Sequence, residues 1–268
     1  MFDYTSIPQV KQMSASRLSM SVSIADLRGR ALVQPERSAL FTRTPLDALL
    51  APSGVPRGRL IEVFGAPSSG KTSIAFALLA ACTGDGLLAA YVDPCGALFA
   101  PAAAGAGIQL SRLLVIRPPN ADVARRALDA VVRCGACALV VFDCTGLGDV
   151  LRAHHCTRLA SQAEKTGTAL LALTNGDVPA LASFASLRLR AAGLTPVWQE
   201  GSAARGRLAG CTSSVEVVKS RMSAPGKRAS ISAALPEVAG SWPTSADGAP
   251  VVPAAAEQPV RIARAANA

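Results

Sequence analysis

The eight residues Gly65-Ala66-Pro67-Ser68-Ser69-Gly70-Lys71-Thr72 constrain this chain more than any other segment. They fit the pattern G-x-x-x-x-G-K-[ST], in which a glycine-rich turn points successive backbone N–H groups at phosphate oxygens. In that pattern Lys71 supplies a charge to the β- and γ-phosphates, and the Thr72 hydroxyl is placed to ligate Mg²⁺. The segment, with Ser73 directly after it, therefore predicts a site for a nucleoside triphosphate such as ATP together with Mg²⁺.

The residues on either side of this loop have the required character. Residues 60–64 read as a short buried strand, and residues 73–82 read as an apolar helix. A strand, the loop and then a helix is the setting in which this motif holds phosphate, because the helix adds its positive N-terminal dipole. An ordinary Gly/Ser turn is the alternative, and this context argues against it.

The rest of the chain alternates between apolar strands and helices. Continuous apolar strands are predicted at 88–93, 113–116, 138–143 and 169–173, and helices are predicted at 121–133 and 150–165. Strands of this fully buried type imply an α/β fold with a mostly parallel central sheet and helices on both faces. A further strand begins at residue 186. After residues 186–190 the pattern changes to alternation of apolar and polar residues, as in 215–219, which indicates antiparallel strands at the sheet edge.

The domain organisation follows from composition. Residues 1–43 are weakly patterned and are interpreted as an N-terminal extension, and residues 44–235 form the predicted nucleotide-binding core. Residues 236–268 are rich in Pro, Ala, Gly and Ser, which is typical of a disordered tail.

Composition and charge indicate where in the cell the protein is located, but they do not identify what it binds. The 268 residues are 50% hydrophobic but only 4% aromatic, so the core is expected to consist of Ala, Val and Leu. No apolar stretch reaches the ~20 residues of a membrane span, and no signal peptide is evident, so we expect a cytoplasmic protein without membrane contact. The net charge of +9 suits nucleic acid, an acidic protein or a polyphosphate equally.

The cysteines and histidines offer no strong metal motif. Seven cysteines in a chain without an export signal are expected to be reduced thiols. Cys134 and Cys137 have C-x-x-C spacing, but they lie at a predicted turn and lack a second pair. His154-His155-Cys156 contains three potential ligands, yet neighbouring residues on a helix point in different directions. A structural role is the preferred interpretation for both groups.

A nucleotide site of this kind needs a carboxylate beyond the Mg²⁺, on the end of a nearby buried strand. Asp143 follows Leu139-Val140-Val141-Phe142 and matches that Walker B arrangement, so Asp143 and Thr72 are the predicted metal contacts. Asp93, which ends an earlier strand, is a second candidate.

At this point the sequence resembles a known family. Residues 58–72 are similar to the P-loop region of RecA recombinases, and residues 91–98 resemble the segment in which RecA carries its catalytic glutamate. Residues 215–225 are similar to the RecA strand that ends in two cations. The resemblance covers roughly residues 44–232 and implies a RecA-like P-loop core that binds ATP.

The departures from RecA concern catalysis and DNA. Cys95 stands where RecA has the glutamate that activates water, and losing a positioned base typically costs ~10²–10⁴ in rate. Gly176 stands where RecA has a glutamine that senses the γ-phosphate. The segments 144–174 and 176–185, where RecA carries its DNA-binding loops, are short and contain no aromatic platform for bases. The resemblance therefore implies ATP binding with no assigned catalytic residue, and leaves hydrolysis open.

Two cations keep their RecA-like positions. Lys219 and Arg221 match the residues that RecA presents to the nucleotide of a neighbouring subunit, where an Arg can bridge a γ-phosphate. Alternatively, they are solvated charges that protect an edge strand from aggregation.

A shortened RecA-like chain of this kind resembles the ImuA family. That resemblance implies an accessory ATP-binding protein of the SOS response and translesion mutagenesis. Its partners would be RecA, a Y-family-like protein or an error-prone replicative-type polymerase, and contact with single-stranded DNA would be weak. The enzymatic alternative is a divergent DNA-dependent ATPase and recombinase with Asp93 or Glu62 as base and Arg188 and Arg190 on DNA. A clock-type or RadA/RadB-like P-loop regulator is a third possibility.

Overall fold

A computed structural model describes residues 39–50, 54–147, 150–199, 207–221 and 224–234, and the statements below concern these residues. Its strands are β1 (Ala39–Leu40), β2 (Val55–Pro56), β3 (Leu60–Phe64), β4 (Ala89–Val92), β5 (Leu113–Ile116), β6 (Leu139–Asp143), β7 (Ala169–Thr174), β8 (Leu187–Gln199), β9 (Arg207–Ser220) and β10 (Arg228–Ala234). Its helices are α2 (Pro45–Leu49), α3 (Lys71–Gly84), α4 (Ala100–Gly105), α5 (Ala121–Cys134), α6 (Ala153–Thr166) and α7 (Pro179–Phe184), with a 3-10 helix η1 (Leu110–Arg112). Most of the expected N-terminal extension and the expected tail lie outside these residues.

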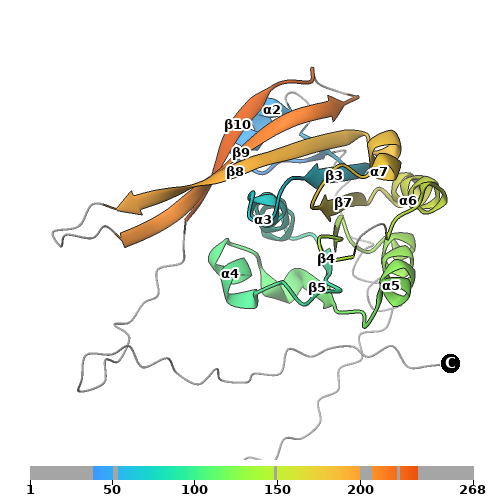
Figure 1. The fold of residues 1–268 in the computed structure, drawn as a ribbon. Helices are drawn as coiled ribbons and strands as arrows, with labels where there is room; N and C mark the ends of the chain where they lie inside the picture. The colour runs from blue at the N-terminus through green and yellow to red at the C-terminus, as the bar shows by residue number, and fades with distance from the viewer. Residues whose placement is uncertain (1–38, 51–53, 148–149, 200–206, 222–223, 235–268) are drawn as a thin grey trace, which may run out of the picture.

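One eight-stranded sheet organises the molecule (Figure 1). Its strand order is β10-β9-β8-β3-β7-β6-β4-β5, and the six strands from β8 to β5 run parallel. Strands β9 and β10 are antiparallel to their neighbours. The predicted mostly parallel sheet with antiparallel strands at one edge is confirmed, and the carboxyl ends of the parallel strands meet at one edge of the sheet.

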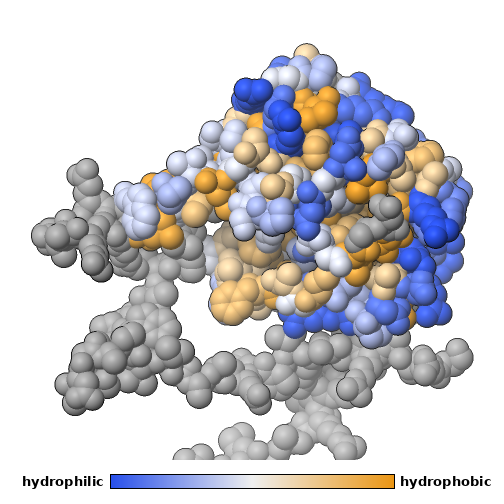
Figure 2. Space-filling model, viewed as in Figure 1, coloured by the Kyte–Doolittle hydropathy of each residue, from blue (hydrophilic) through white to orange (hydrophobic). Residues whose placement is uncertain are grey.

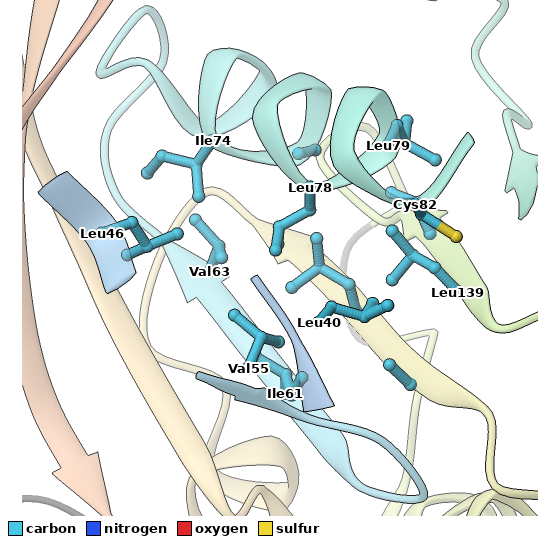
Figure 3. Packing of buried hydrophobic residues seen from close by; sticks show 14 of the residues in the cluster. Leu40, Leu46, Val55, Ile61, Val63, Ile74, Leu78, Leu79, Cys82 and Leu139 are labelled. Atoms are coloured by element: carbon cyan, nitrogen blue, oxygen red, sulfur yellow. The ribbon is translucent and has the colours of Figure 1, made fainter. Parts of the chain in front are cut away.

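Helices cover both faces of this sheet, as predicted. Because side chains alternate along a strand, Ile61 and Val63 of β3 pack with α3, whereas Leu60 packs with α6 on the other face. Figure 3 shows Ile74 and Leu78 of α3 reaching the strand residues beneath them. The core is largely aliphatic, as the low aromatic content indicated, although Tyr91 and Phe142 are also buried in it.

The helix boundaries differ slightly from those predicted. Helix α3 runs two residues further at each end than the predicted 73–82. Helix α6 begins at Ala153, not at residue 150, and Val150 and Leu151 before it are buried in a non-helical segment that packs in the core. Leu40 of β1 is buried in the main core although it precedes residue 44.

Strands β8 and β9 form a long hairpin, called here the arm, that projects beyond the rest of the sheet (Figure 1). The pairing runs from Leu187–Ser220 to Gln199–Arg207 and contains three register shifts. Figure 2 shows hydrophobic and polar surface interspersed along this arm. Among its described residues Trp198 is 60% exposed. No helix in the described part of the chain has the length and apolar character needed to cross a membrane.

Candidate nucleotide-binding site

The predicted phosphate loop connects β3, a central strand, to helix α3. Gly70 has φ 97°, a left-handed conformation that a side chain would strain, and a Cβ atom there would collide with the Ser213 side chain. A Cβ atom on Gly65 would likewise collide with the Ala191 carbonyl oxygen. Both motif glycines are therefore required by the close approach of the arm, as well as by the turn that the motif predicts.

The N-terminal end of α3 supplies backbone N–H donors that are not used within the helix. The helix begins at Lys71, so the N–H groups of its first turn have no acceptor within the helix. Ser69, which precedes it, is 4% exposed, and its Oγ atom has no hydrogen-bond partner among the described residues. An unpartnered buried hydroxyl beside a helix N-terminus is what a bound anion would satisfy.

Lys71 lies folded over the loop. Its side chain is buried, and the ammonium donates hydrogen bonds to the carbonyl oxygens of Gly65 at 2.8 Å and Ala66 at 2.6 Å. Burial lowers the pKa of Lys71, and the charge of Asp143 offsets part of this effect. The structure thus brings together Lys71 and Asp143, which are 72 positions apart in the sequence.

Asp143 ends β6 at the same edge of the sheet. Its Oδ2 atom accepts a hydrogen bond from the Tyr91 hydroxyl at 2.9 Å. Its Oδ1 atom accepts from the Thr145 backbone N–H at 3.0 Å and from the Thr145 hydroxyl at 2.6 Å. Burial and the carboxylate together raise the pKa of Tyr91, which keeps the phenol protonated. Asp143 is therefore a buried carboxylate held in a fixed orientation, while Thr72 is exposed at the helix start.

Tyr91 and Thr145 were not predicted as parts of this site. Tyr91 is a hydroxyl-bearing residue within a predicted apolar strand, and Thr145 follows Asp143 by two positions, so both signals were present. They carry no motif of their own, and only the pairing of β4 with β6 brings Tyr91 beside Asp143.

Asp93 and Cys95 lie in the turn after β4 and differ in their surroundings. The buried Asp93 carboxylate accepts from the backbone N–H groups of Ala97 at 2.8 Å and Leu98 at 3.0 Å, and pairs with Arg117 at 3.3 Å. It therefore fixes the turn. Cys95 is exposed, and its Sγ atom lies so close to Gly146 that a Cβ atom there would collide with it. This places Cys95 against the loop that follows Asp143.

Glu62 and Arg188 form a buried ion pair on the α7 face of the sheet. Arg188 Nε lies 2.5 Å from Glu62 Oε2, and the second nitrogen of Arg188 lies 2.5 Å from Asp177 Oδ1. Thr174 donates to Glu62 at 3.1 Å, and the guanidinium also stacks on the Phe64 ring at 4.6 Å. Burial raises the pKa of Glu62, and the hydrogen bond and charge of Arg188 offset part of this rise.

This ion pair was not predicted, and it bears on the enzymatic alternative. A Glu62 carboxylate engaged by Arg188 and sealed in the sheet is not available as a base for water. Arg188 is equally withdrawn from DNA. Arg190, the other predicted DNA contact, is exposed but pairs with Glu216. Glu62 and Arg188 lie 126 positions apart in the sequence, so no local sequence pattern could have predicted their contact.

Lys219 and Arg221 have different environments. The Lys219 ammonium donates to the carbonyl oxygens of Ala182 at 2.8 Å and Ser183 at 3.2 Å, at the end of α7. Arg221 is exposed after the end of β9. Lys219 is thus tied to its own subunit, whereas the predicted contact with a neighbouring nucleotide stays a prediction for both residues.

The predicted structural cysteines and histidines are spread apart. Cys156 is buried in the core, while His154 is exposed, so the two side chains leave α6 in different directions. Cys137 is buried and Cys134 half-buried, and both are free thiols. Within the described residues, no group of three or more His, Cys, Asp or Glu side chains could hold a metal ion.

Comparison with known proteins identifies this architecture. Residues 32–150 match the family model of the RecA N-terminal domain. The crystal structure of the RadB recombinase superposes with a TM-score of 0.55 at 21% identity, covering 71% of this chain and 94% of that structure. The chain has a RecA-like fold. The RecA-like core expected from three sequence blocks is confirmed at this level.

Sequence relatives align with the RecA-like core only in part. RecA of Caulobacter sp. (strain K31) is 43% identical over 98 residues, which are 37% of this chain and 28% of that protein. RecA of Sulfurovum sp. (strain NBC37-1) is 34% identical over 143 residues, which are 50% of this chain and 41% of that protein. The chain therefore spans less than half the length of these RecA relatives.

Proposed function

We propose that this RecA-like chain binds ATP with Mg²⁺ at the loop of residues 65–72. The observation that carries the proposal is the conformation of this loop. Gly65 and Gly70 lie directly against the arm, and the buried Ser69 hydroxyl, which has no partner among the described residues, lies beside the N-terminus of α3. Lys71 would exchange its two carbonyl partners for phosphate oxygens. Thr72 and Asp143 would hold the metal, directly or through water. The metal would supply charge neutralisation at the phosphates.

We further propose that the protein is an accessory factor in the DNA-damage response and translesion mutagenesis. The absence of an available base among the expected positions supports this view. Cys95 offers a sulfur atom, Asp93 fixes a turn, and Glu62 is bound to Arg188. A positioned base contributes typically ~10²–10⁴ to a rate, so hydrolysis would be slow.

The loop after β7 also supports an accessory role. It contains only the six-residue helix α7 before β8 begins. Asp177 at its start is tied to Arg188, and the carbonyl groups at its end are tied to Lys219. A short loop fastened at both ends is poorly suited to order around single-stranded DNA, so we expect weak DNA contact of a salt-sensitive kind.

We propose RecA, a Y-family-like protein or an error-prone replicative-type polymerase as the partner class. The support is the resemblance to ImuA together with the RecA-like fold, since a chain with one RecA-like face can bind a filament end without extending it. The exposed Arg221 is the proposed contact to a neighbour's nucleotide.

A pull-down from DNA-damaged cells tests this proposal. Wild type and Lys71→Ala are compared in the presence of ATP, and Lys165→Ala, which alters an exposed lysine of α6, serves as control. We expect RecA or a mutagenesis polymerase component with wild type and the control, and less with Lys71→Ala. Recovery of neither partner by wild type would contradict the accessory role.

A further inference from the structure

The arm makes direct contact with the phosphate loop through Ser213 of β9. The Ser213 hydroxyl donates a hydrogen bond of 3.1 Å to the Ser69 carbonyl oxygen, and Ser213 is 0% exposed. Ser213 lies two residues before Val215 and four before Val217, so its side chain shares their buried face of the strand. A polar residue at this position of an apolar face is explained by its partner in the loop.

Because the peptide bond is planar, the hydrogen bond to the Ser69 carbonyl also sets the direction of the Gly70 N–H. In a planar trans peptide the C=O and the following N–H point in opposite directions. When Ser213 holds the Ser69 carbonyl, it therefore fixes the Gly70 N–H on the side of the loop that faces away from β9. The neighbouring peptides are held by other bonds, since the Ser69 N–H donates to the Ala66 carbonyl at 3.2 Å and the Gly70 carbonyl accepts from the Ile74 N–H at 3.1 Å. Neither of these bonds involves the Ser69–Gly70 peptide itself, which Ser213 holds.

The loop also approaches the arm closely at its two motif glycines. A Cβ atom on Gly70 would lie 3.1 Å from a methyl group of Leu194 in β8, as well as against Ser213. Gly65 at the other end of the loop approaches the Ala191 backbone of β8. The arm thus approaches both ends of the loop, and Ser213 donates a hydrogen bond to it.

We propose that Ser213 is a positioning residue for phosphate binding, which holds the Ser69–Gly70 peptide so that the Gly70 N–H faces the phosphates. This inference rests on the proposed binding of ATP and adds a residue outside the motif. It also makes the arm part of the nucleotide site, although the arm lies more than a hundred residues away in the sequence.

Calorimetric titration of MgATP into wild type, Ser213→Ala and Ser213→Cys tests the proposal. Cysteine fills the position with a side chain at least as large as that of serine, but its thiol is a weak donor. The net value of a typical hydrogen bond corresponds to a change of about five- to tenfold in the dissociation constant. We therefore expect both variants to bind MgATP about five- to tenfold more weakly.

Thr212→Ala is the matched control. Thr212 neighbours Ser213 in β9, and its hydroxyl bonds to Ser232 at 3.1 Å on the exposed side of the arm. This variant loses a comparable hydrogen bond without touching the loop, so its affinity for MgATP should match wild type. Urea unfolding of all four proteins measures their stability separately. If Ser213→Ala does not fold, the comparison of Ser213→Cys with wild type tests the proposal.

The outcomes separate this inference from the proposed function. If wild type binds MgATP and both Ser213 variants bind it equally well, the positioning role is refuted while ATP binding stands. Weakening by Ser213→Ala alone would indicate lost volume and refute the hydrogen-bond argument, and equal weakening by Thr212→Ala would refute it too. If wild type binds no MgATP, both proposals fall.

Discussion

At the scale of single residues, the seven thiols divide by environment. Burial raises the pKa of Cys82 and Cys137 to about 12 and that of Cys156 to about 11. Cys144, next to Asp143, is also buried, and its thiol pKa is raised by burial and by that carboxylate. Cys95 is exposed beside Gly146. Reactivity toward alkylating reagents follows the thiolate form, so these environments predict different rates.

We predict that Cys95 is alkylated first in the native protein at pH 8. A thiol of pKa about 12 has only ~10⁻⁴ of its population as thiolate at that pH, so Cys82 and Cys137 should remain unmodified. Raising the pH toward 11 increases the thiolate fraction of Cys156, so Cys156 should be alkylated before Cys82 and Cys137. Mass spectrometry of timed samples measures the order, and fast native labelling of Cys82 would contradict this assignment.

At the scale of elements, the Glu62–Arg188 pair joins β3 to β8 and, through Asp177, to the loop before α7. Both members of the pair are buried. Removing Arg188 leaves the Glu62 carboxylate buried without a counter-charge, and removing Glu62 leaves the buried Arg188 with only the exposed Asp177. Breaking a buried ion pair in this way costs about 3–5 kcal/mol, whereas replacing both members is often close to neutral.

We therefore predict that Arg188→Leu and Glu62→Gln each lower the free energy of unfolding by about 3 kcal/mol. The double variant should lose clearly less than the sum of the two single losses, because no buried charge is left unpaired and Asp177, which loses Arg188, is solvent-exposed. Urea unfolding of the four proteins measures this coupling. Additive losses would show that the two side chains do not act as a pair. Arg190→Leu is the control, because Arg190 belongs to an exposed ion pair, and it should change the free energy of unfolding by less than about 1 kcal/mol.

The elements around the phosphate loop were predictable from the sequence. Strand β3, the loop and helix α3 follow from a motif and from the apolar stretches on either side, because buried segments of this kind have a strong local signal. Asp143 was predicted for the same reason, as the polar end of an apolar strand. The parallel sheet and its antiparallel edge followed from the change in periodicity near residue 186.

The arm and the contacts that it makes were not predictable in the same way. The sequence indicated short strands at 186–190 and 215–219, whereas β8 and β9 continue to Gln199 and from Arg207. The outer part of the hairpin is solvated on both sides and contains Gly193 and Pro196, so it lacks the alternation that marks a half-buried strand. Ser213 and Arg188 act through partners more than a hundred positions away, which only the folded sheet brings near.

At the scale of the whole molecule, the proposed nucleotide site is assembled from the sheet edge, helix α3 and the arm. The RecA-like core retains the loop and the Asp143 carboxylate, while the segments after β6 and β7 contain little besides α6 and α7. The central claim is that the chain holds a triphosphate at Lys71 but does not use DNA to accelerate its hydrolysis.

One calorimetric experiment tests this claim most directly. MgATP is titrated into wild type and into Lys71→Ala, and single-stranded oligonucleotide is then added to the saturated protein while the heat flow is followed. We predict saturable binding heat for wild type, at least tenfold weaker binding for Lys71→Ala, and no sustained heat after the oligonucleotide. Absence of binding heat with wild type, or a sustained heat flow of hydrolysis that begins with the oligonucleotide, would contradict the account.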